Sequence, residues 1–138
     1  MTRYVLPKSP LAPLCQRGEF LPLEKGGEEG FSLERLYNYG LTSNLFMNAV
    51  EASPEGEIIR VWSYKKRKNL FIEVMDRGCG ILKEKREEIF APFYTTKPGG
   101  TGLGLAIAKK IVEAHQGYLE VRNNAEKGAT FRATISIG

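Results

Sequence analysis

Glycines crowd one segment of the chain in a way that suits phosphate binding, at Gly99, Gly100, Gly102 and Gly104. Glycine tolerates positive φ and lacks a side chain, so this backbone can bring bare N–H groups close to a ligand. An apolar face at helical spacing follows from Leu105 to Ala114, and Gly117 stands where helices commonly end. Because a helix start attracts anions, the segment predicts a phosphate site. On its own, the segment could also be a glycine-rich turn that only caps a packing helix.

Two other groups of polar residues have spacing that suits chemistry. Asn44 and Asn48 are one helical turn apart and share a face with Glu51. Asp76 ends an apolar run and is followed by Gly78 and Gly80, which permit a sharp backbone reversal. Taken alone, the asparagines fit a solvated helix surface, and Asp76 is either a turn-former or a ligand contact.

The elements that must position these residues follow from periodicity. Ser32 can cap a helix that runs to about Ala52, and the charged stretch 82–88 predicts a short helix. Alternating or β-rich runs predict four strands, at residues 57–64, 69–75, 118–123 and 129–137. Strands in hairpins with helices to cover one face indicate an α+β fold, a two-layer sandwich.

Residues 1–30 differ from the rest of the chain. This segment is rich in proline and glycine and shows no helical or strand periodicity over a useful length. We expect a poorly ordered arm at 1–30 and one domain at 31–138. The alternative is that residues 17–23 pair as an edge strand.

Composition excludes several classes of function. A chain of 138 residues with 42% apolar residues fits one soluble globular domain. The basic run 65–68 is short and lacks interleaved aromatic residues, so no nucleic-acid surface is predicted. Cys15 and Cys79 lie far apart without metal-ligand spacing, which fits a reducing cytosol. Neither a membrane span nor a signal peptide is predicted.

The polar groups fall into an ordered set of motifs: NLFMNAVEA (44–52), DRGCGI (76–81), FAPF (90–93), GTGLGL (100–105) and GATF (128–131). In order and spacing this set resembles the N, G1, F and G2 boxes of the ATP-binding domain of sensor histidine kinases. The family belongs to the GHKL (HATPase_c) superfamily. The form TTKPGGTGLGLAIAKKIVEAHQG is most similar to the nitrogen-regulation type. The resemblance covers residues 44–138 and implies a Bergerat-type fold, with a mixed, mostly antiparallel sheet covered on one face by helices. The P-loop and Rossmann glycine patterns are absent.

The resemblance implies an adenine site around Asp76. Its carboxylate would accept a hydrogen bond from the adenine amino group, and Gly78 and Gly80 would let the backbone pass close to the base. Thr130 is similar to the threonine that the family places near the adenine, through water. Cys79 lies in the same turn, at a position read as tolerant of many side chains.

The resemblance also implies a magnesium and phosphate site. Asn48 would hold Mg²⁺ through its side-chain oxygen, beside Asn44 near the phosphates, since Mg²⁺ prefers hard oxygen ligands. Catalytic roles fall to Asn48, Glu51 and Lys97. Glu51 would polarise water or orient Asn48, unless it is simply an exposed helix residue. The ATP lid and the helix start after it would contribute Thr95, Thr96, Lys97, Gly100, Thr101, Gly102, Leu103, Gly104 and Leu105.

The activity implied is that of an ATP-binding catalytic module, with ATP and Mg²⁺ as cofactors. It would pass the γ-phosphoryl group to a histidine on a helical-hairpin domain in trans, and so act indirectly on a response regulator in the cytoplasm. That hairpin is missing ahead of Asn44, and His115, beyond the lid, is not expected to replace it. A truncated kinase whose first strand was lost, leaving an open sheet edge, is one hypothesis. Alternatives are a non-catalytic ATP-binding regulatory module and an anti-sigma serine kinase.

Overall fold

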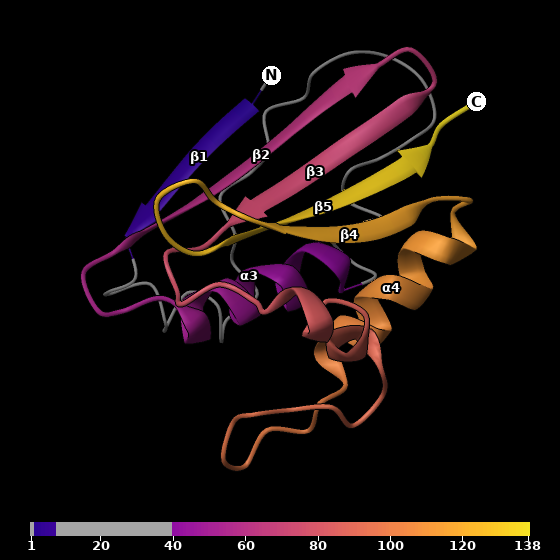
Figure 1. The fold of residues 1–138 in the computed structure, drawn as a ribbon. Helices are drawn as coiled ribbons and strands as arrows, with labels where there is room; N and C mark the ends of the chain where they lie inside the picture. The colour runs from indigo at the N-terminus through magenta and orange to yellow at the C-terminus, as the bar shows by residue number, and fades with distance from the viewer. Residues whose placement is uncertain (1, 8–39) are drawn as a thin grey trace.

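The computed structural model describes residues 2–7 and 40–138. The elements follow the order β1 (Thr2–Pro7), α3 (Leu41–Ala52), β2 (Ile58–Lys66), β3 (Asn69–Met75), η1 (Lys83–Lys85), η2 (Glu88–Phe90), α4 (Gly104–Ala114), β4 (Tyr118–Asn123) and β5 (Ala129–Ser136). The strands form one sheet in the order β1-β2-β3-β5-β4. In Figure 1, α3 and α4 lie side by side on one face of this sheet. The α+β fold with two layers is therefore confirmed.

All strand pairs among the described residues are antiparallel, whereas a mixed sheet was expected. Tight turns join β2 to β3 and β4 to β5, and such hairpins produce antiparallel pairs without a crossover. The prediction of a mixed sheet was wrong in this respect. The prediction of four strands at 57–64, 69–75, 118–123 and 129–137 holds to within two residues at each end.

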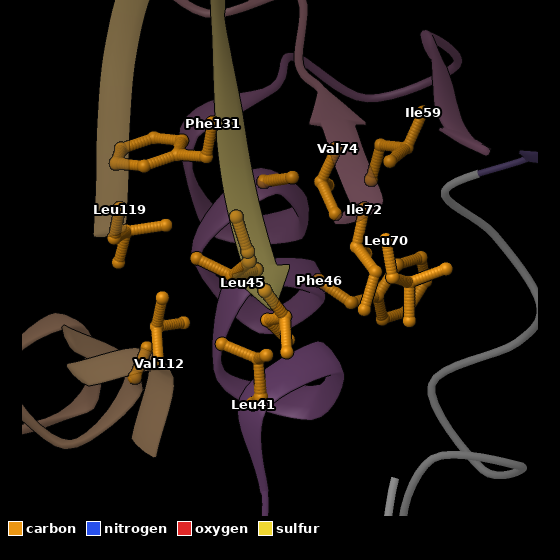
Figure 2. Close-up of a cluster of buried hydrophobic side chains, with 14 residues drawn as sticks. Leu41, Leu45, Phe46, Ile59, Leu70, Ile72, Val74, Val112, Leu119 and Phe131 are labelled. Carbon is orange, nitrogen blue, oxygen red and sulfur yellow. The ribbon is translucent and has the colours of Figure 1, made fainter. Parts of the chain in front are cut away.

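The core lies between the helices and the inner face of the sheet (Figure 2). From α3, Leu41 and Leu45 are fully buried and face the inward residues of the central strands, such as Val74 on β3 and Phe131 on β5. Val112 brings α4 into the same cluster. Along β5, inward side chains alternate with outward ones because successive residues of a strand point to opposite faces. This alternation decides which residues can reach a site between the layers.

The outer face of the sheet carries a buried ion pair. Glu73 on β3 is only 3% exposed, and Arg132, its partner across to β5, donates a hydrogen bond from Nε to its carboxylate. A second bond runs from Arg132 Nη1 to Glu120 Oε1 on β4 at 3.4 Å. The hydrogen bond to Glu73 raises the pKa of the Arg132 guanidinium. These residues link three neighbouring strands on the face opposite to α3 and α4.

Helix α3 begins later than predicted. Gly40 has a φ of +75°, outside the helical region, and α3 starts at Leu41. A continuous helix from Ser32 to Ala52 is therefore wrong at Gly40, although its second half is confirmed. Residues 32–39 lie outside the described residues. The short helix predicted at 82–88 is replaced by η1 and η2, two single turns closed by i→i+3 bonds, because so short a stretch cannot sustain an α-helix.

The first seven residues contain a strand where an arm without regular structure was expected. Backbone pairing joins β1 to β2 over six residues, from Thr2 opposite Ser63 to Pro7 opposite Ile58. The open edge anticipated beside β2 is thus occupied by Thr2–Pro7. The remainder of the expected arm, including the alternative strand at 17–23, lies outside the described residues.

Candidate functional site

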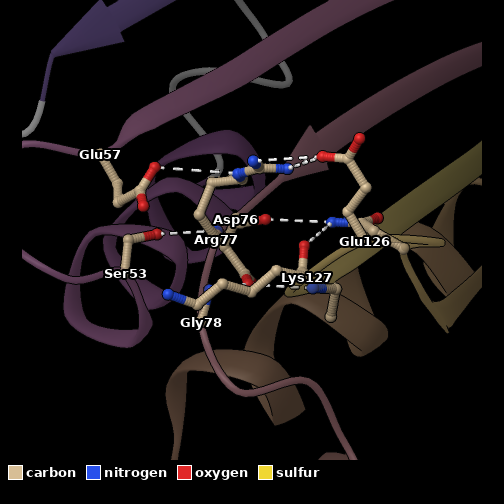
Figure 3. Close-up of polar contacts among 9 residues, drawn as sticks. Ser53, Glu57, Asp76, Arg77, Gly78, Glu126 and Lys127 are labelled. Carbon is tan, nitrogen blue, oxygen red and sulfur yellow. Dashed lines mark hydrogen bonds and ion pairs between the residues drawn. The ribbon is translucent and has the colours of Figure 1, made fainter.

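Asp76 directly follows β3 and carries a buried carboxylate, with 3% of the residue exposed. Its Oδ1 atom accepts two backbone hydrogen bonds, from Gly78 N at 2.9 Å and from Ala129 N at 3.0 Å. Figure 3 shows Asp76 and Gly78 within this group of polar contacts. Because Oδ1 holds the local backbone, Oδ2 is the oxygen left to accept a bond from a ligand. Asp76 therefore acts as a turn-former through one oxygen and can still be a ligand contact through the other.

The turn between β4 and β5 fixes the backbone of Asp76 from the other side. Asn124 donates from Nδ2 to the carbonyl oxygens of Asp76 and Lys127, at 3.0 and 2.9 Å. Gly128, at a φ of +85°, packs so closely that a Cβ atom there would lie 2.2 Å from the Asp76 carbonyl oxygen. Only glycine fits at this contact. The prediction missed the role of Asn124, which depends on a partner far away in the sequence.

The loop after Asp76 is held by Asn123. The Asn123 side chain accepts from Ile81 N at 2.9 Å and donates to Ile81 O at 3.0 Å. Between them, Gly80 has a φ of +77°, and a Cβ there would lie 3.1 Å from Asn123 Oδ1. The loop 77–81 is therefore tied to the end of β4, and Asn123 is a second residue that sequence reasoning missed.

The same loop also packs on the C-terminal end of α3. Arg77 N donates to Ser53 Oγ at 3.0 Å, and a Cβ on Gly78 would lie 2.6 Å from the Ala52 carbonyl oxygen. In Figure 3 the Arg77 guanidinium lies between the carboxylates of Glu57 and Glu126, at 3.8 and 3.3 Å. These contacts fix Asp76 beside the last turn of α3.

Asn48 and Glu51 on α3 meet a lysine from the distant loop. Lys97 forms an ion pair with Glu51 and donates from Nζ to Asn48 Oδ1 at 3.4 Å. Asn44 lies one turn earlier on the same helix, and its Oδ1 is 3.3 Å from the position that a Cβ of Gly104 would take. The structure therefore brings Asn44, Asn48, Glu51 and Lys97 together along one face of α3.

The loop 91–103, which hangs below the helices in Figure 1, is closed at its base. Phe93 N donates to Gly102 O at 3.0 Å. Gly102 has a φ of +69°, and a Cβ atom added there would lie 2.5 Å from the Phe93 carbonyl carbon. Two hydroxyls serve turns inside the loop, because Thr95 Oγ1 accepts from Lys97 N and Thr101 Oγ1 from Leu103 N. We define residues 91–103 as the lid.

Aromatic residues at the lid base have separate roles. The Phe90 ring packs edge-on against Phe131 at 6.2 Å and belongs to the periphery of the core. The Phe93 side chain is 75% exposed, and its backbone has a φ of +68°. Phe90 therefore packs on the core, whereas Phe93 is exposed to solvent.

Helix α4 starts at Gly104 without a side-chain cap. The N–H groups of the first turn of any α-helix have no acceptor within the helix, and no side chain among residues 2–7 and 40–138 caps this one. The Leu105 side chain is partly buried against the core. Gly100, Gly102, Leu103 and Thr96 lie along the chain leading to this end, and Thr96 is exposed. An anion would find unpaired N–H groups and the positive end of the helix dipole at this position.

Thr130 is not brought to the Asp76 carboxylate. Phe131 points into the core, so the alternation of β5 places the Thr130 side chain on the outer face of the sheet. There its hydroxyl donates to Asn124 Oδ1 at 2.5 Å. Ala129, whose amide bonds to Asp76 Oδ1, lies on the inner side in its place. Thr130 is therefore left out of the candidate site.

The remaining groups form a line along α3. The loop of Asp76 and Gly78 packs at Ala52, Lys97 meets Asn48 one turn earlier, and the start of α4 lies at Asn44. Eight residues separate Asn44 from Ala52, which is about 12 Å of helix. The acceptor at the Asp76 end suits a base. The amide oxygens in the middle suit a metal, and the unpaired N–H groups at the start of α4 suit phosphates. The donor set therefore fits an extended adenine nucleotide with Mg²⁺.

A metal here would depend on the nucleotide. The described residues hold no group of three or more His, Cys, Asp or Glu side chains that could bind an ion by themselves. One amide oxygen from Asn48 is the kind of ligand that Mg²⁺ accepts while keeping waters and phosphate oxygens. Within 2–7 and 40–138, helices are also too short or too polar to cross a bilayer.

Comparison with protein families gives a match over residues 38–138, to the family described as histidine kinase-, DNA gyrase B-, and HSP90-like ATPase. The matched range includes the loop of Asp76, the lid and both helices. The same range contains all the residues of the candidate site.

Among curated proteins, the chain is 37% identical over 94 residues to sporulation kinase C of Bacillus subtilis (strain 168). It is 44% identical over 96 residues to the signal transduction histidine-protein kinase AtoS of Escherichia coli (strain K12). Each alignment covers 68% of this chain but only 22% and 16% of the relative. The chain thus spans about a fifth of the length of these kinases.

Solved structures agree with the fold. A nucleotide-free catalytic domain of the histidine kinase ThkA superposes with a TM-score of 0.67 at 37% identity, covering 75% of this chain and 67% of that one. Full-length ShkA in complex with AMPPNP gives 0.65 at 27% identity, covering 75% and 22%. AMPPNP is an analogue of ATP.

Proposed function

The chain belongs to the histidine kinase-, DNA gyrase B-, and HSP90-like ATPase family, and we propose that it is the ATP-binding catalytic module of a two-component sensor histidine kinase. In this proposal it holds Mg·ATP so that the γ-phosphoryl group passes to a histidine on another domain or chain. The observation that carries it is the line of groups along α3, from Asp76 at Ala52 to the uncapped start of α4 at Asn44.

The base end selects adenine. Asp76 Oδ2 is an acceptor on a rigid backbone, because Oδ1 is held by two amides and the carbonyl by Asn124. Adenine presents an exocyclic amino donor where guanine presents a carbonyl oxygen, so a fixed acceptor favours ATP over GTP. Gly78 and Gly80 let the loop pack closely on Ala52 and Asn123, which fixes the backbone beside Asp76.

The phosphate end supplies positive charge and donors. The amides at the start of α4, from Gly102 to Leu105, would receive phosphate oxygens, and Lys97 would contact them from the lid. Asn48 would hold Mg²⁺ through Oδ1, with Asn44 beside the phosphates. When bound, Mg·ATP supplies the phosphoryl group and neutralises the charge that develops on it. The protein's own task is to position the nucleotide and to exclude wrong geometries.

The phosphoacceptor is expected from outside this module. His115 follows α4 and its Nδ1 lies 2.8 Å from the Ile111 carbonyl oxygen, so the ring is held against the helix end opposite to the lid. A histidine on a helical-hairpin domain is the proposed acceptor, with a response regulator as the later recipient. Two-component signalling of this kind takes place in the cytoplasm, which we propose as the location.

Phosphotransfer in trans tests the proposal. The protein is mixed with Mg·ATP radiolabelled in the γ-phosphate and with a separate histidine-hairpin domain of a histidine kinase. We expect acid-labile, base-stable label on the hairpin domain. The label should vanish with Asn48→Ala and Asp76→Asn, and should persist with His115→Gln.

The same experiment separates the main alternative. Binding of ATP without label on any hairpin domain tried would support a non-catalytic regulatory module. No uptake of ATP at all would overturn both readings. Label that is stable to acid would instead indicate transfer to a hydroxyl, as in a serine kinase.

A further inference from the structure

Glu51 and Lys97 join two elements that are 46 residues apart in the chain. Glu51 lies on α3 and Lys97 near the tip of the lid, and both side chains are partly exposed, at 51% and 39%. The same Nζ atom also donates to Asn48 Oδ1 at 3.4 Å. Without a nucleotide, the lid is therefore held against the metal-binding face of α3 by one ammonium group.

The ammonium group occupies the place where the proposed function needs a cation. A magnesium ion bound to Asn48 Oδ1 would lie about 2.1 Å from that oxygen. Since Lys97 Nζ is 3.4 Å from the same atom, the two cations could be no more than about 5.5 Å apart. Like charges at that distance repel, and Glu51 alone cannot neutralise both. Metal binding at Asn48 therefore weakens the Lys97 bond to the same oxygen.

From this geometry we infer that Glu51 is a positioning residue that latches the lid through Lys97 in the absence of nucleotide. Arrival of Mg·ATP displaces Lys97 from Asn48 and releases it toward the phosphates. The inference rests on the proposed function for the nucleotide step, whereas the latch itself does not need a ligand. Glu51 then weakens nucleotide binding slightly, because its bond to Lys97 must break first.

Hydrogen–deuterium exchange of the lid tests the latch without any nucleotide. We expect Glu51→Gln and Lys97→Met each to raise exchange in peptides covering 91–103 by about two- to fivefold, the range for an exposed ion pair. The exchanged pair, Glu51→Lys with Lys97→Glu, should restore protection. Glu88→Gln is the matched control, because it breaks an exposed pair with Lys85 that lies outside the lid. Unchanged lid exchange in Glu51→Gln would overturn the latch.

A double-mutant cycle on nucleotide affinity tests how Glu51 acts. If it acts through Lys97, Glu51→Gln should tighten Mg·ATP binding about two- to fivefold in the wild type and leave it unchanged in Lys97→Met. Lys97→Met alone should weaken Mg·ATP binding, so the two single substitutions should change the affinity in opposite directions. Equal tightening in both backgrounds would mean that Glu51 merely repels the phosphates, and would overturn the inference.

Failure of the proposed function gives a different pattern. If no variant binds ATP, the affinity cycle has no signal and the proposed function fails, yet lid exchange still decides whether the latch exists. If ATP binds but lid exchange does not respond to either substitution, the latch fails and the proposed function stands.

Discussion

Asp76 and Ala129 exchange two hydrogen bonds across the end of the sheet. Asp76 N donates to Ala129 O at 2.9 Å, and Ala129 N donates to the Asp76 side chain at 3.0 Å. The side-chain oxygen of Asp76 thus accepts the bond that a backbone carbonyl oxygen would accept in a continued ladder of β3 and β5. One oxygen continues the sheet, and the other is presented to the space beside α3.

Asp76→Asn should separate these two duties. The amide oxygen of asparagine can replace Oδ1 toward Gly78 and Ala129, so the thermal midpoint should fall by only a few degrees. The NH₂ group would face the adenine amino group, and we expect ATP affinity to fall by about one to two orders of magnitude. Calorimetric titration measures this loss. Asp76→Ala serves as the contrast, because it should lose both stability and affinity. Affinity within twofold of the wild type in Asp76→Asn would remove Asp76 from the base site.

Gly128→Ala should destabilise the domain by about 2 to 4 kcal/mol, since positive φ and a steric clash act together. The added Cβ would lie 2.2 Å from the Asp76 carbonyl oxygen. Gly56→Ala is the matched control, at a φ of +82° with nothing within 4 Å of its Cβ, and should cost only about 1 to 2 kcal/mol. Urea unfolding compares the two. Equal losses would show that backbone conformation alone, and not the contact with Asp76, requires glycine at 128.

Asn123→Ala should loosen the loop after Asp76. It removes both side-chain bonds to Ile81, so we expect a loss of about 1 to 2 kcal/mol in stability and faster exchange of the Ile81 amide. ATP affinity should fall several-fold because Gly78 and Gly80 lose their support. Asn69→Ala, at the opposite end of β3, is the control, since no hydrogen bond of its side chain is found within 2–7 and 40–138. An unchanged Ile81 exchange rate would contradict the tie to β4.

Arg132→Ala should cost more stability than Glu73→Gln. The first leaves a carboxylate that is 3% exposed without its main partner, which costs about 3 kcal/mol. The second leaves Arg132 with Glu120 and with its packing over the Phe71 ring, at 6.0 Å. Urea unfolding of both variants gives the difference, and the opposite order would contradict it.

The pKa of Arg132 also predicts how this pair responds to pH. The bond to Glu73 raises that pKa. A raised pKa stabilises the folded state at pH values below the unfolded pKa, and the contribution is lost only as pH rises through the folded value. The difference between wild type and Arg132→Ala should therefore stay constant between about pH 6 and 9.

Removal of magnesium should matter only while Asn48 is present. Chelation with EDTA should weaken ATP binding to the wild type by about tenfold or more, whereas Asn48→Ala should start weak and lose little further. Titration calorimetry with and without the chelator gives the four affinities. Met47→Ala, an exposed neighbour on α3, should keep the full magnesium effect. Additive losses in Asn48→Ala would place the metal elsewhere.

Local patterns predicted most of the fold because they are set within a few residues. The strands β2 to β5 and helix α4 follow from alternation and helical spacing, and tertiary packing agrees with both. A helix from Ser32 to Ala52 would hold Gly40 in its interior, at a cost of about 1 kcal/mol relative to alanine. The structure instead gives it positive φ and starts α3 after it, a choice between two allowed states of glycine that sequence does not decide.

The candidate site was harder to predict where it depends on register. The segment GATF offers two small residues beside each other, and only the pairing of β5 with β3 shows that Ala129 faces inward and Thr130 outward. Asn123 ends a predicted strand and Asn124 follows it in the turn, and their partners lie 42 and 48 residues away. The ion pair of Lys97 with Glu51 likewise joins segments that no local pattern connects.

The hydrogen bond between Phe93 and Gly102 closes the lid into a loop whose two ends lie together. The entropic cost of closing a loop grows only with the logarithm of its length, by about 0.6 kcal/mol for each doubling of the number of residues. Gly99, which has nothing within 4 Å of its Cβ position, is therefore a site where extra residues, such as a fluorophore-binding tag, could be inserted without disturbing either anchor.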